Sequence, residues 1–240
     1  MRFGKIAYLN LLPFDVFIKA YPLPSFMKQY IALKKSYPSK LNEDFLFGRI
    51  DAGFISSIAG MRAHLKNHAT KSGIISKGAV WSVLALQGNG LDYQSATSNA
   101  LLQVLNLQGK VLIGDRALLV KFGDSKYARN ALDLGAVWWE REGVPFVFGR
   151  LCFHKFGARL QHLSAEFNRT FDTKYKKIPY FILQDASKKS GIKADFIKQY
   201  LQRIFYKISP KERVGLERFY RAVRLKQIKQ PQRFYNKKGI

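Results

Sequence analysis

Uncharged polar side chains gather where the sequence predicts strand ends and helix starts. They are Asn10, Ser56, Ser57, Ser82, Ser95 and Thr97. Each hydroxyl or amide group can donate a hydrogen bond, and a helix start adds backbone N–H groups, so such a set suits carboxylates. The alternative is that all six are ordinary caps and satisfied polar groups. Because they form four separate clusters at predicted strand ends, we favour a cleft that binds a small organic anion.

Several familiar catalytic patterns are missing from the sequence. His64 and His68 share a helix face at i, i+4, but no glutamate or third ligand completes a zinc site, so we expect no metal. There is no Gly-x-Ser-x-Gly nucleophile motif, Walker loop or Gly-x-Gly-x-x-Gly fingerprint, so we expect no cofactor. The one cysteine, Cys152, lies in the apolar run 144–153, which favours a buried hydrophobe over a reactive thiol.

Alternating strands and helices position the first donors. The sequence predicts strands at residues 3–9, 30–34 and 52–56, and helices at residues 12–20, 39–48 and 58–65. This order is typical of a parallel sheet with right-handed crossovers. Asn10 follows the first strand and Ser56 ends the third, so we expect both at the edge where open α/β proteins bind ligands.

Two apolar strands, at residues 80–86 and 144–153, bracket the middle of the chain. A middle segment with two crossing connections is typical of a two-lobed protein. Within it we expect a helix at 99–107 that the cluster Ser95 to Ser98 opens, a strand at 111–114, a helix or turn at 116–122 and a helix around Trp138. The remainder is expected to be mostly helical, with helices at 157–171, 193–205 and 211–223.

Composition limits the classes of partner. The chain has 240 residues, of which 47% are hydrophobic and 14% aromatic, as in globular proteins. Its formal net charge of +25, from 41 Lys and Arg against 16 Asp and Glu, favours an anionic partner. The basic residues are scattered and match no zinc-finger, homeodomain or basic-zipper spacing, so we expect no nucleic-acid partner. A basic nucleic-acid-binding module stays an alternative on charge alone and predicts steeply salt-dependent affinity.

Neither a membrane segment nor an export signal is expected. No uncharged run reaches the roughly 20 apolar residues of a spanning helix. Near the N-terminus, Asn10, Pro13 and Asp15 interrupt any apolar signal segment. The single cysteine fits a reducing compartment. We therefore expect a cytoplasmic protein without a membrane partner.

Five short blocks resemble a known family. They occur in order as GKIAYLNLLPF at residues 4–14, DAGFISS at 51–57, SAT at 95–97, IGDRAL at 113–118 and GVPFVF at 143–148. Together they resemble the chorismate dehydratases of the futalosine route to menaquinone. The resemblance spans roughly residues 1 to 150, and the C-terminal third adds little to it. The connection 106–110 is shorter than is usual in this family, which predicts a smaller second lobe.

The resemblance implies a fold and an activity. The fold is a periplasmic-binding-protein-like, type II arrangement of two α/β lobes around a cleft, with a helical C-terminal part. We expect one lobe from residues 1–82 and 150–240 and a smaller lobe from residues 83–149. The implied activity is a carbon–oxygen lyase reaction, the dehydration of chorismate to 3-[(1-carboxyvinyl)oxy]benzoate. Nothing in the resemblance fixes the oligomeric state.

The family's residues carry over onto matching positions. Asn10 resembles the functional asparagine, which would orient the ring substituents near the leaving hydroxyl group. Asp115 could be a general acid or base or could cap the following helix, and the substrate's own carboxylate is another candidate base. Arg116 could place a positive charge near a carboxylate or face the solvent. The two carboxylates of chorismate would be bound by Ser56 and Ser57 and by the helix start at Ser95, Ala96 and Thr97, with Ser82 lining the cleft.

Two further functions stay open at this point. One is the sister enzyme that releases 1,4-dihydroxy-6-naphthoate and is expected to use a histidine base, although the matching motifs contain no histidine. The other is a solute-binding receptor that holds an anion without reacting it. Such receptors are normally exported, so the expected cytoplasmic location argues against this function.

Overall fold

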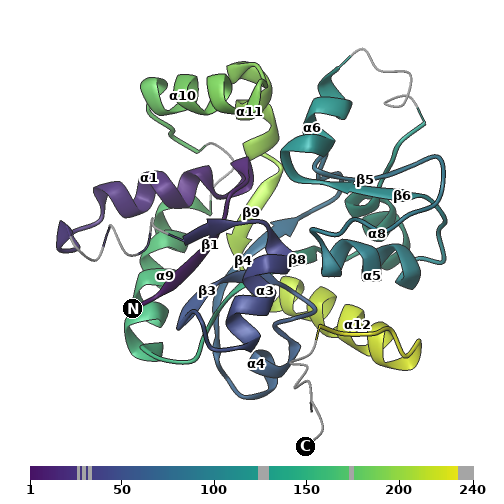
Figure 1. The fold of residues 1–240 in the computed structure, drawn as a ribbon, viewed down its shortest axis with the longest axis horizontal. Coiled ribbons are helices and arrows are strands. Elements are labelled where there is room, and N and C mark those ends of the chain that lie inside the picture. Colours follow the sequence, from purple (N-terminus) through teal and green to yellow (C-terminus); the bar gives the residue numbers. More distant parts are fainter. Residues whose placement is uncertain (26–27, 29–30, 32–33, 124–129, 173–175, 232–240) are drawn as a thin grey trace, which may run out of the picture.

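The computed structural model describes residues 1–25, 28, 31, 34–123, 130–172 and 176–231, and it contains two β-sheets (Figure 1). The larger sheet has the strand order β2-β1-β3-β8-β4-β9 and the smaller one the order β6-β5-β7. We call each sheet with the helices packed on it the large lobe and the small lobe. The strands of the larger sheet are β1 (Phe3–Ile6), β2 (Lys34–Ser36), β3 (Ala52–Ser56), β4 (Ala69–Ser76), β8 (Phe146–Phe153) and β9 (Ile204–Lys207). Those of the smaller sheet are β5 (Val83–Leu86), β6 (Lys110–Ile113) and β7 (Leu132–Asp133).

In the first half of the chain, strands and helices alternate in the order that the sequence predicts. A 3-10 turn, η1 (Leu9–Leu11), leads into α1 (Leu12–Ala20), and Pro13 lies in the first turn of α1, where a missing N–H has no cost. The others are α3 (Pro38–Leu46), α4 (Met61–Leu65), α5 (Ala96–Val104), α6 (Gly114–Phe122), α8 (Leu134–Glu142), α9 (Gly157–Phe171), α10 (Tyr180–Ser190), α11 (Ala194–Leu201) and α12 (Pro210–Leu225).

The predicted parallel arrangement is confirmed for the first three strands. β1 pairs in parallel with β2 and with β3, whereas β8 and β4 pair antiparallel with their neighbours. Of the strand expected at 30–34, Lys34 lies in β2 and Ile31 is helical, and the remaining residues are outside the described part. The first strand is shorter than expected, because residues 9–11 already form η1.

Several elements differ from the sequence prediction, and the short strand β7 is one of them. β4 was not expected, because Thr70, Ser72 and Gly73 interrupt its apolar pattern. The helix expected at 193–205 is wrong at its end: α11 stops at Leu201, and Ile204 begins β9. In β9 the side chains at 204 and 206 are buried while Lys207 is exposed, which is the alternation of a strand. The helix α10 was also not expected.

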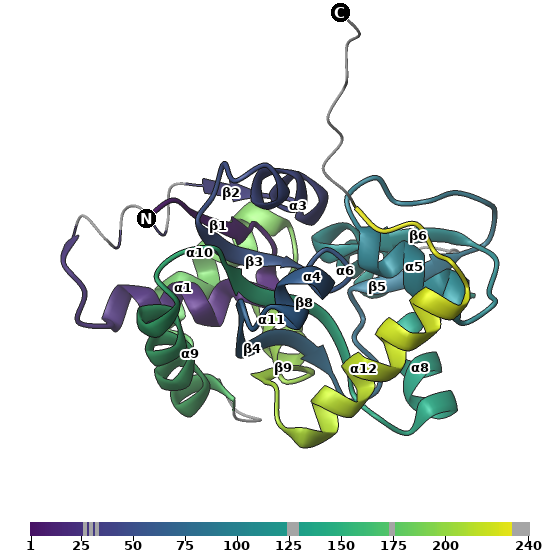
Figure 2. The ribbon, with the colours of Figure 1, turned by 90° about the horizontal axis from the view of Figure 1, so that it is seen from below.

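Helices cover both faces of the larger sheet (Figure 2). Successive side chains of a strand point to opposite faces, and β1 shows this at Phe3 and Gly4. Phe3 stacks on Phe14 of α1, at 5.9 Å between ring centroids, and Phe14 also contacts Phe167 of α9 at 5.1 Å. On the other face, a Cβ atom at Gly4 would meet the side chain of Leu41 in α3.

Helix α12 connects the two lobes. It lies on β8 and extends to α5 and α8 (Figure 2). The ring of Phe219 packs against Phe146 of β8 at 5.0 Å and against Trp138 of α8 at 6.3 Å. All of β8, residues 146–149 included, pairs within the larger sheet. The predicted division of the chain into one lobe of residues 1–82 and 150–240 and a second lobe of residues 83–149 stays a prediction. In this division, residues 146–149 would belong to the second lobe, although they pair within the larger sheet. Within the described residues, no helix is long and apolar enough to cross a membrane.

Candidate functional site

A narrow pocket lies between the two sheets, and four of the predicted residues line it. They are Asn10, Ser56, Ser82 and Ser95. Asn10 lies in η1 directly after β1, Ser56 ends β3, and Ser95 caps α5. Segments that are far apart in the sequence thus bring uncharged donors to one place, at the carboxyl ends of the parallel strands β1 and β3.

The other four predicted residues do not line this pocket. Ser57 is buried behind it, and its carbonyl oxygen accepts a hydrogen bond from the Tyr220 hydroxyl group at 2.8 Å. Thr97 uses its hydroxyl oxygen to accept the Ile58 N–H at 3.1 Å. Ala96 is the first residue of α5. The fourth residue is Asp115. All four lie around the pocket, and their part in binding stays a prediction.

Asn10 has a buried side chain with an unused hydrogen-bonding atom. Its backbone carbonyl accepts a hydrogen bond from the Tyr206 hydroxyl group at 2.6 Å, which fixes the backbone of η1. Its side-chain Oδ1 is buried and has no hydrogen-bond partner among the described residues. Leaving a buried polar atom unpaired costs about 1–3 kcal/mol. A ligand that donates a hydrogen bond to Oδ1 would remove this cost.

Ser56 is held by a residue that the sequence analysis did not select. The side chain of Asn42, in α3, donates to the Ser56 hydroxyl oxygen at 2.6 Å and accepts the Ser56 N–H at 2.9 Å. Because the serine oxygen already accepts a bond, its own proton is directed elsewhere and can reach a ligand in the pocket. The sequence signal for Asn42 was its position three residues after Ser39. If Ser39 were a helix cap, the glutamate of a capping box would stand there.

Ser82 is held in the same way. Its hydroxyl oxygen accepts a hydrogen bond from the Tyr200 hydroxyl group at 3.0 Å. Burial raises the pKa of Tyr200, so this phenol stays protonated and keeps donating. The proton of Ser82 is therefore also available to a ligand. Tyr200 is a second functional residue that the sequence did not reveal, because it lies on α11, far along the chain.

Ser95 acts as a helix cap, as the alternative interpretation predicted. Its hydroxyl oxygen accepts the Ser98 N–H at 3.1 Å, and its proton goes to the Ser98 hydroxyl oxygen at 2.8 Å. Ser98 lines the pocket too, so its own proton is the one that this pair offers to a ligand. Ser98 belongs to the serine cluster that the sequence analysis noted, but it was not selected as a site residue.

A polar network joins the lobes beside these donors. The hydroxyl group of Tyr8, which lines the pocket, donates to Oε1 of Gln94 at 2.5 Å. Arg116 donates to the same oxygen at 2.8 Å and to Asp92 at 2.6 Å. The Gln94 carbonyl oxygen accepts the Ser39 N–H of the large lobe at 3.0 Å. The charge of Arg116 is thus matched by Asp92, and burial raises the pKa of Tyr8.

Asp115 caps a helix in the opposite lobe. Its Oδ1 accepts the N–H of Leu9, the first residue of η1, at 3.1 Å, although Asp115 itself lies in α6. The sequence predicts that a structural Asp115 caps α6, the helix that follows it in the chain, and this is wrong because its bond goes to η1. Burial raises the pKa of this carboxyl group to about 6, and the bond from Leu9 opposes that shift. Asp115 is therefore a titratable link between the lobes.

The pocket is nearly closed in this conformation. Its volume is about 40 Å³, whereas one water needs roughly 10–15 Å³ measured in this way. An organic acid therefore needs the pocket to widen, as it would if the lobes moved apart. The contacts that separation would break include Tyr8 with Gln94, Leu9 with Asp115 and Ile58 with Thr97.

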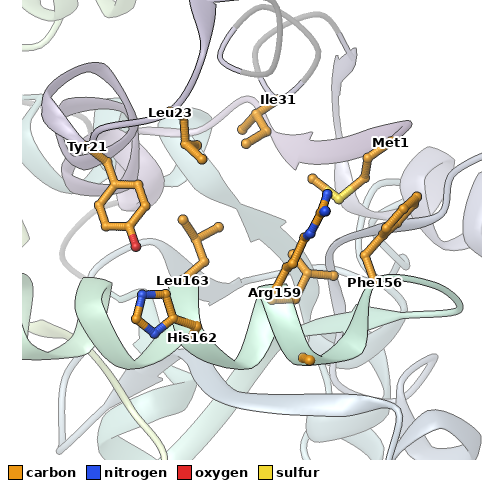
Figure 3. A pocket seen from close by; sticks show the side chains of 10 residues that line it. Met1, Tyr21, Leu23, Ile31, Phe156, Arg159, His162 and Leu163 are labelled. Atoms are coloured by element: carbon orange, nitrogen blue, oxygen red, sulfur yellow. The ribbon is translucent and has the colours of Figure 1, made fainter.

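A larger pocket lies elsewhere in the large lobe (Figure 3). It has a volume of about 640 Å³ and shares no lining residue with the narrow pocket. Figure 3 shows Tyr21 and Leu23 facing Arg159, His162 and Leu163 of α9 across it. Its walls are mainly apolar and contain none of the predicted site residues. We therefore take the narrow pocket as the candidate site.

Two further expectations concern metals and thiols. Among the described residues, no group of three or more His, Cys, Asp or Glu side chains is placed to hold a metal ion. The ring of His64 packs at 5.7 Å from Tyr220, and that of His68 at 5.6 Å from Phe153. Cys152 is fully buried, and burial raises the pKa of its thiol to about 11. The prediction of a small buried hydrophobe at Cys152 is confirmed.

Comparison with known proteins assigns the family. Residues 1–111 and 95–224 match the model of a family described as menaquinone biosynthesis. The chain belongs to this menaquinone biosynthesis family. A curated relative, the chorismate dehydratase of Campylobacter jejuni subsp. jejuni serotype O:23/36 (strain 81-176), is 43% identical over 226 residues, which are 92% of this chain and 97% of the relative. The family resemblance of the five sequence blocks is confirmed.

Solved structures with this fold are distant in sequence. Protein AF1704 from Archaeoglobus fulgidus aligns with a TM-score of 0.61 and 12% identity, over 95% of this chain and 99% of its own. The alkanesulfonate-binding protein SsuA from Xanthomonas axonopodis pv. citri, bound to MOPS, aligns with a TM-score of 0.55 and 13% identity, over 97% of this chain and 95% of its own. These likenesses show the fold alone. They confirm the predicted periplasmic-binding-protein-like fold of this menaquinone biosynthesis family member.

Proposed function

We propose that this protein is a chorismate dehydratase, a carbon–oxygen lyase of menaquinone biosynthesis by the futalosine route. The identity of 43% over 92% of the chain to a chorismate dehydratase supports the activity. The observation that carries the site assignment is the pocket itself, which Asn10, with an Oδ1 that has no partner among the described residues, lines together with serine hydroxyl groups from both lobes. The proposed compartment is the cytoplasm, which the unpaired Cys152 fits.

The reaction removes a hydroxyl group and a proton from neighbouring ring carbons. The carbon–oxygen bond to the hydroxyl group breaks, the carbon that carries the enolpyruvyl ether loses its proton, and the ring becomes aromatic as water leaves. Since aromatisation drives the reaction, the protein has to bind, orient and assist charge separation. Positioning and preorganised hydrogen bonds supply a large share of such catalysis.

Each pocket donor has a role in this proposal. The protons of Ser56 and Ser82 are free because Asn42 and Tyr200 occupy their oxygens, so they would bind the ring carboxylate. The Ser98 proton and the start of α5 would bind the enolpyruvyl carboxylate. The Oδ1 atom of Asn10 would accept a hydrogen bond from the departing hydroxyl group and so fix the ring.

Two groups are candidates for the proton acceptor. Burial raises the pKa of Asp115 to about 6, but its oxygen is engaged by Leu9 and it does not line the pocket. A carboxylate of the substrate needs no protein base and would lie beside the ring. We propose the substrate carboxylate as acceptor, which would pass its proton to the departing hydroxide so that water forms, and we assign Asp115 a positioning role through η1, next to Asn10.

Incubation of the purified protein with chorismate tests the activity. Formation of the aromatic enolpyruvyl benzoate, followed by ultraviolet absorbance and by mass spectrometry, is the expected result. The solute-binding receptor would instead bind chorismate, seen by calorimetry, and return it unchanged. Recovery of unchanged chorismate from a saturated, folded protein would overturn the proposed dehydratase.

A further inference from the structure

Arg150, in the middle of β8, is a buried cation that pairs with no carboxylate of the described residues. Only 4% of it is exposed, and its Nη2 atom donates to the Thr70 carbonyl oxygen at 3.3 Å. Its Nε and Nη1 atoms are buried and have no hydrogen-bond partner among the described residues. None of the ion pairs formed by those residues includes it. A guanidinium group stays charged, and buried charges are normally paired.

A pocket between α4 and α12 lies next to this cation. Its volume is about 210 Å³, and its lining residues are Met61, His64, Leu65, Glu217, Tyr220 and Arg224. Tyr220 links the pocket to Arg150. Burial raises the pKa of Tyr220 to about 12, while the nearby charge of Arg150 acts in the opposite direction. Arg150 therefore lies at the phenol group of a residue that lines the pocket.

The charges around this pocket are mainly positive. Arg150 and Arg224 carry permanent charges, and the one lining carboxylate, Glu217, is bound by Arg213 at 2.8 Å. Burial lowers the pKa of His64, Arg150 and Arg213 lower it further, and Glu217 raises it. An anion in the pocket would favour the protonated form of His64, which adds a third positive charge.

We propose that the pocket between α4 and α12 binds a divalent oxyanion of the phosphate type, with Arg150, Arg224 and His64 as its ligands. A planar guanidinium group can donate two parallel hydrogen bonds to such an oxyanion. The volume exceeds what a single phosphate needs. The anion is thus either free inorganic phosphate or the phosphate group of a small ester.

This anion site is connected to the candidate catalytic pocket. The Tyr220 hydroxyl group donates to the Ser57 carbonyl oxygen at 2.8 Å. The Ser57 N–H in turn donates to the Phe148 carbonyl oxygen at 2.9 Å, and both Ser56 and Phe148 line the catalytic pocket. Tyr220, which lines the anion site, therefore also holds the turn that carries Ser56. The proposal concerns a second site and does not depend on the dehydratase activity.

Isothermal titration calorimetry with sulfate at constant ionic strength tests the site. Sulfate is a suitable probe because its charge does not change between pH 6 and 8. We expect binding to wild type that is tighter at pH 6, where His64 gains a proton more readily. Arg224→Gln should weaken it about tenfold, as expected for the loss of a charge-assisted hydrogen bond. Arg150→Gln should remove it. Arg221→Gln, on the same helix but outside the pocket, is the matched control and should bind like wild type.

A second measurement keeps the test decisive if Arg150→Gln does not fold. In wild type, NMR titration of the histidine side chains should show that sulfate raises the pKa of His64 and leaves that of His162, in the other pocket, unchanged. Titrations with inorganic phosphate and with glycerol 3-phosphate distinguish free phosphate from a phosphate ester as the natural ligand. The one that binds more tightly identifies that ligand. Equal sulfate affinity in Arg224→Gln and Arg221→Gln, or an unchanged His64, would overturn the site.

Discussion

Asp115, in the first turn of α6, accepts a hydrogen bond at 3.1 Å from the backbone N–H of Leu9, the residue before Asn10. The bond spans the two lobes and ends beside the side chain that we place at the leaving hydroxyl group. Because Asp115 is half-buried and bonded to Leu9, the state of its proton is coupled both to folding and to the position of η1.

The stability of the protein should depend on pH through Asp115. The pKa of its carboxyl group rises from 3.8 to about 6 on folding, so the folded state favours the proton. Its contribution to the free energy of unfolding is complete below pH 3.8 and is lost as the pH rises to about 6. Asp115→Asn has no proton to lose and should gain up to about 3 kcal/mol relative to wild type over this range. Urea denaturation from about pH 4 to 7 measures the difference.

Asp185→Asn is the control for this pH profile. Asp185 is an exposed carboxylate on α10 that pairs with Lys189 at 2.7 Å. Its variant should follow the wild-type profile. A constant difference in stability between Asp115→Asn and wild type across the range would contradict the raised pKa. Asp115→Asn also tests the positioning role of Asp115. If Asp115 only positions η1, kcat should fall by less than about tenfold, whereas loss of a general base costs about 100-fold or more.

Asn10→Ala should reduce turnover far more than stability. Oδ1 has no partner among the described residues, and the bond from Tyr206 reaches the backbone, so truncation removes no hydrogen bond that these residues form with the side chain. We expect kcat to fall about 100-fold or more, because the ring would no longer be fixed in the orientation that reacts. The melting temperature should change by less than about 4 °C. Steady-state kinetics with chorismate and thermal unfolding measure the two effects.

Asn168→Ala is the matched control for Asn10. Asn168 is equally buried, but its side chain is bound to Ser72 and to the Lys71 carbonyl oxygen, both at 2.9 Å. This variant should lose about 1–3 kcal/mol of stability and keep its kcat, the reverse of the Asn10 result. If Asn10→Ala turns over like wild type, Asn10 has no part in the reaction.

Gly114 should tolerate no side chain, because its backbone and its surroundings both require glycine. Its φ is +63°, and a Cβ atom there would lie 2.7 Å from the ring of Tyr8. Gly114→Ala should therefore lose more than about 2 kcal/mol, the sum of a left-handed backbone penalty and displacement of Tyr8. Chemical denaturation gives the loss of stability, and KM for chorismate should rise because Tyr8 lines the pocket.

Gly143→Ala separates the two causes. Its φ is +65°, almost the same as at Gly114, but nothing lies within 4 Å of its added Cβ atom. It should lose only the backbone penalty of about 1 kcal/mol. Equal losses in the two variants would show that contact with Tyr8 does not matter at Gly114.

The sequence could predict the part of the site that depends on local rules. Asn10 and Ser56 follow strands of a strand-helix-strand unit, and right-handed crossovers place such strand ends at one edge. Ser95 could be predicted as a cap because its bond to Ser98 spans only three residues. Each of these assignments requires only neighbouring residues and the handedness of the chain.

The sequence could not predict the distant partners. Tyr200 orients Ser82 across 118 positions, and nothing in the pattern of α11 indicates a phenol at the pocket. The strand β4 was not predicted for the same reason. Its polar Ser72 looks unsuited to a buried strand, but Ser164 and Asn168 of α9 satisfy its hydroxyl group at 2.7 and 2.9 Å. Polar satisfaction of this kind is visible only once the helix lies on the sheet.

Asn42 and Ser56 should be energetically coupled. Their side chains and the Ser56 N–H form two buried hydrogen bonds, at 2.6 and 2.9 Å. Asn42→Ala should lose about 1–3 kcal/mol because the Ser56 N–H is left buried and unpaired, and KM should rise because the Ser56 hydroxyl group is no longer oriented. A double-mutant cycle with Ser56→Ala isolates the side-chain bond and should give a coupling energy of about 1 kcal/mol. Additive losses would mean that Asn42 supports the backbone alone, and KM would then respond to Ser56→Ala but not to Asn42→Ala.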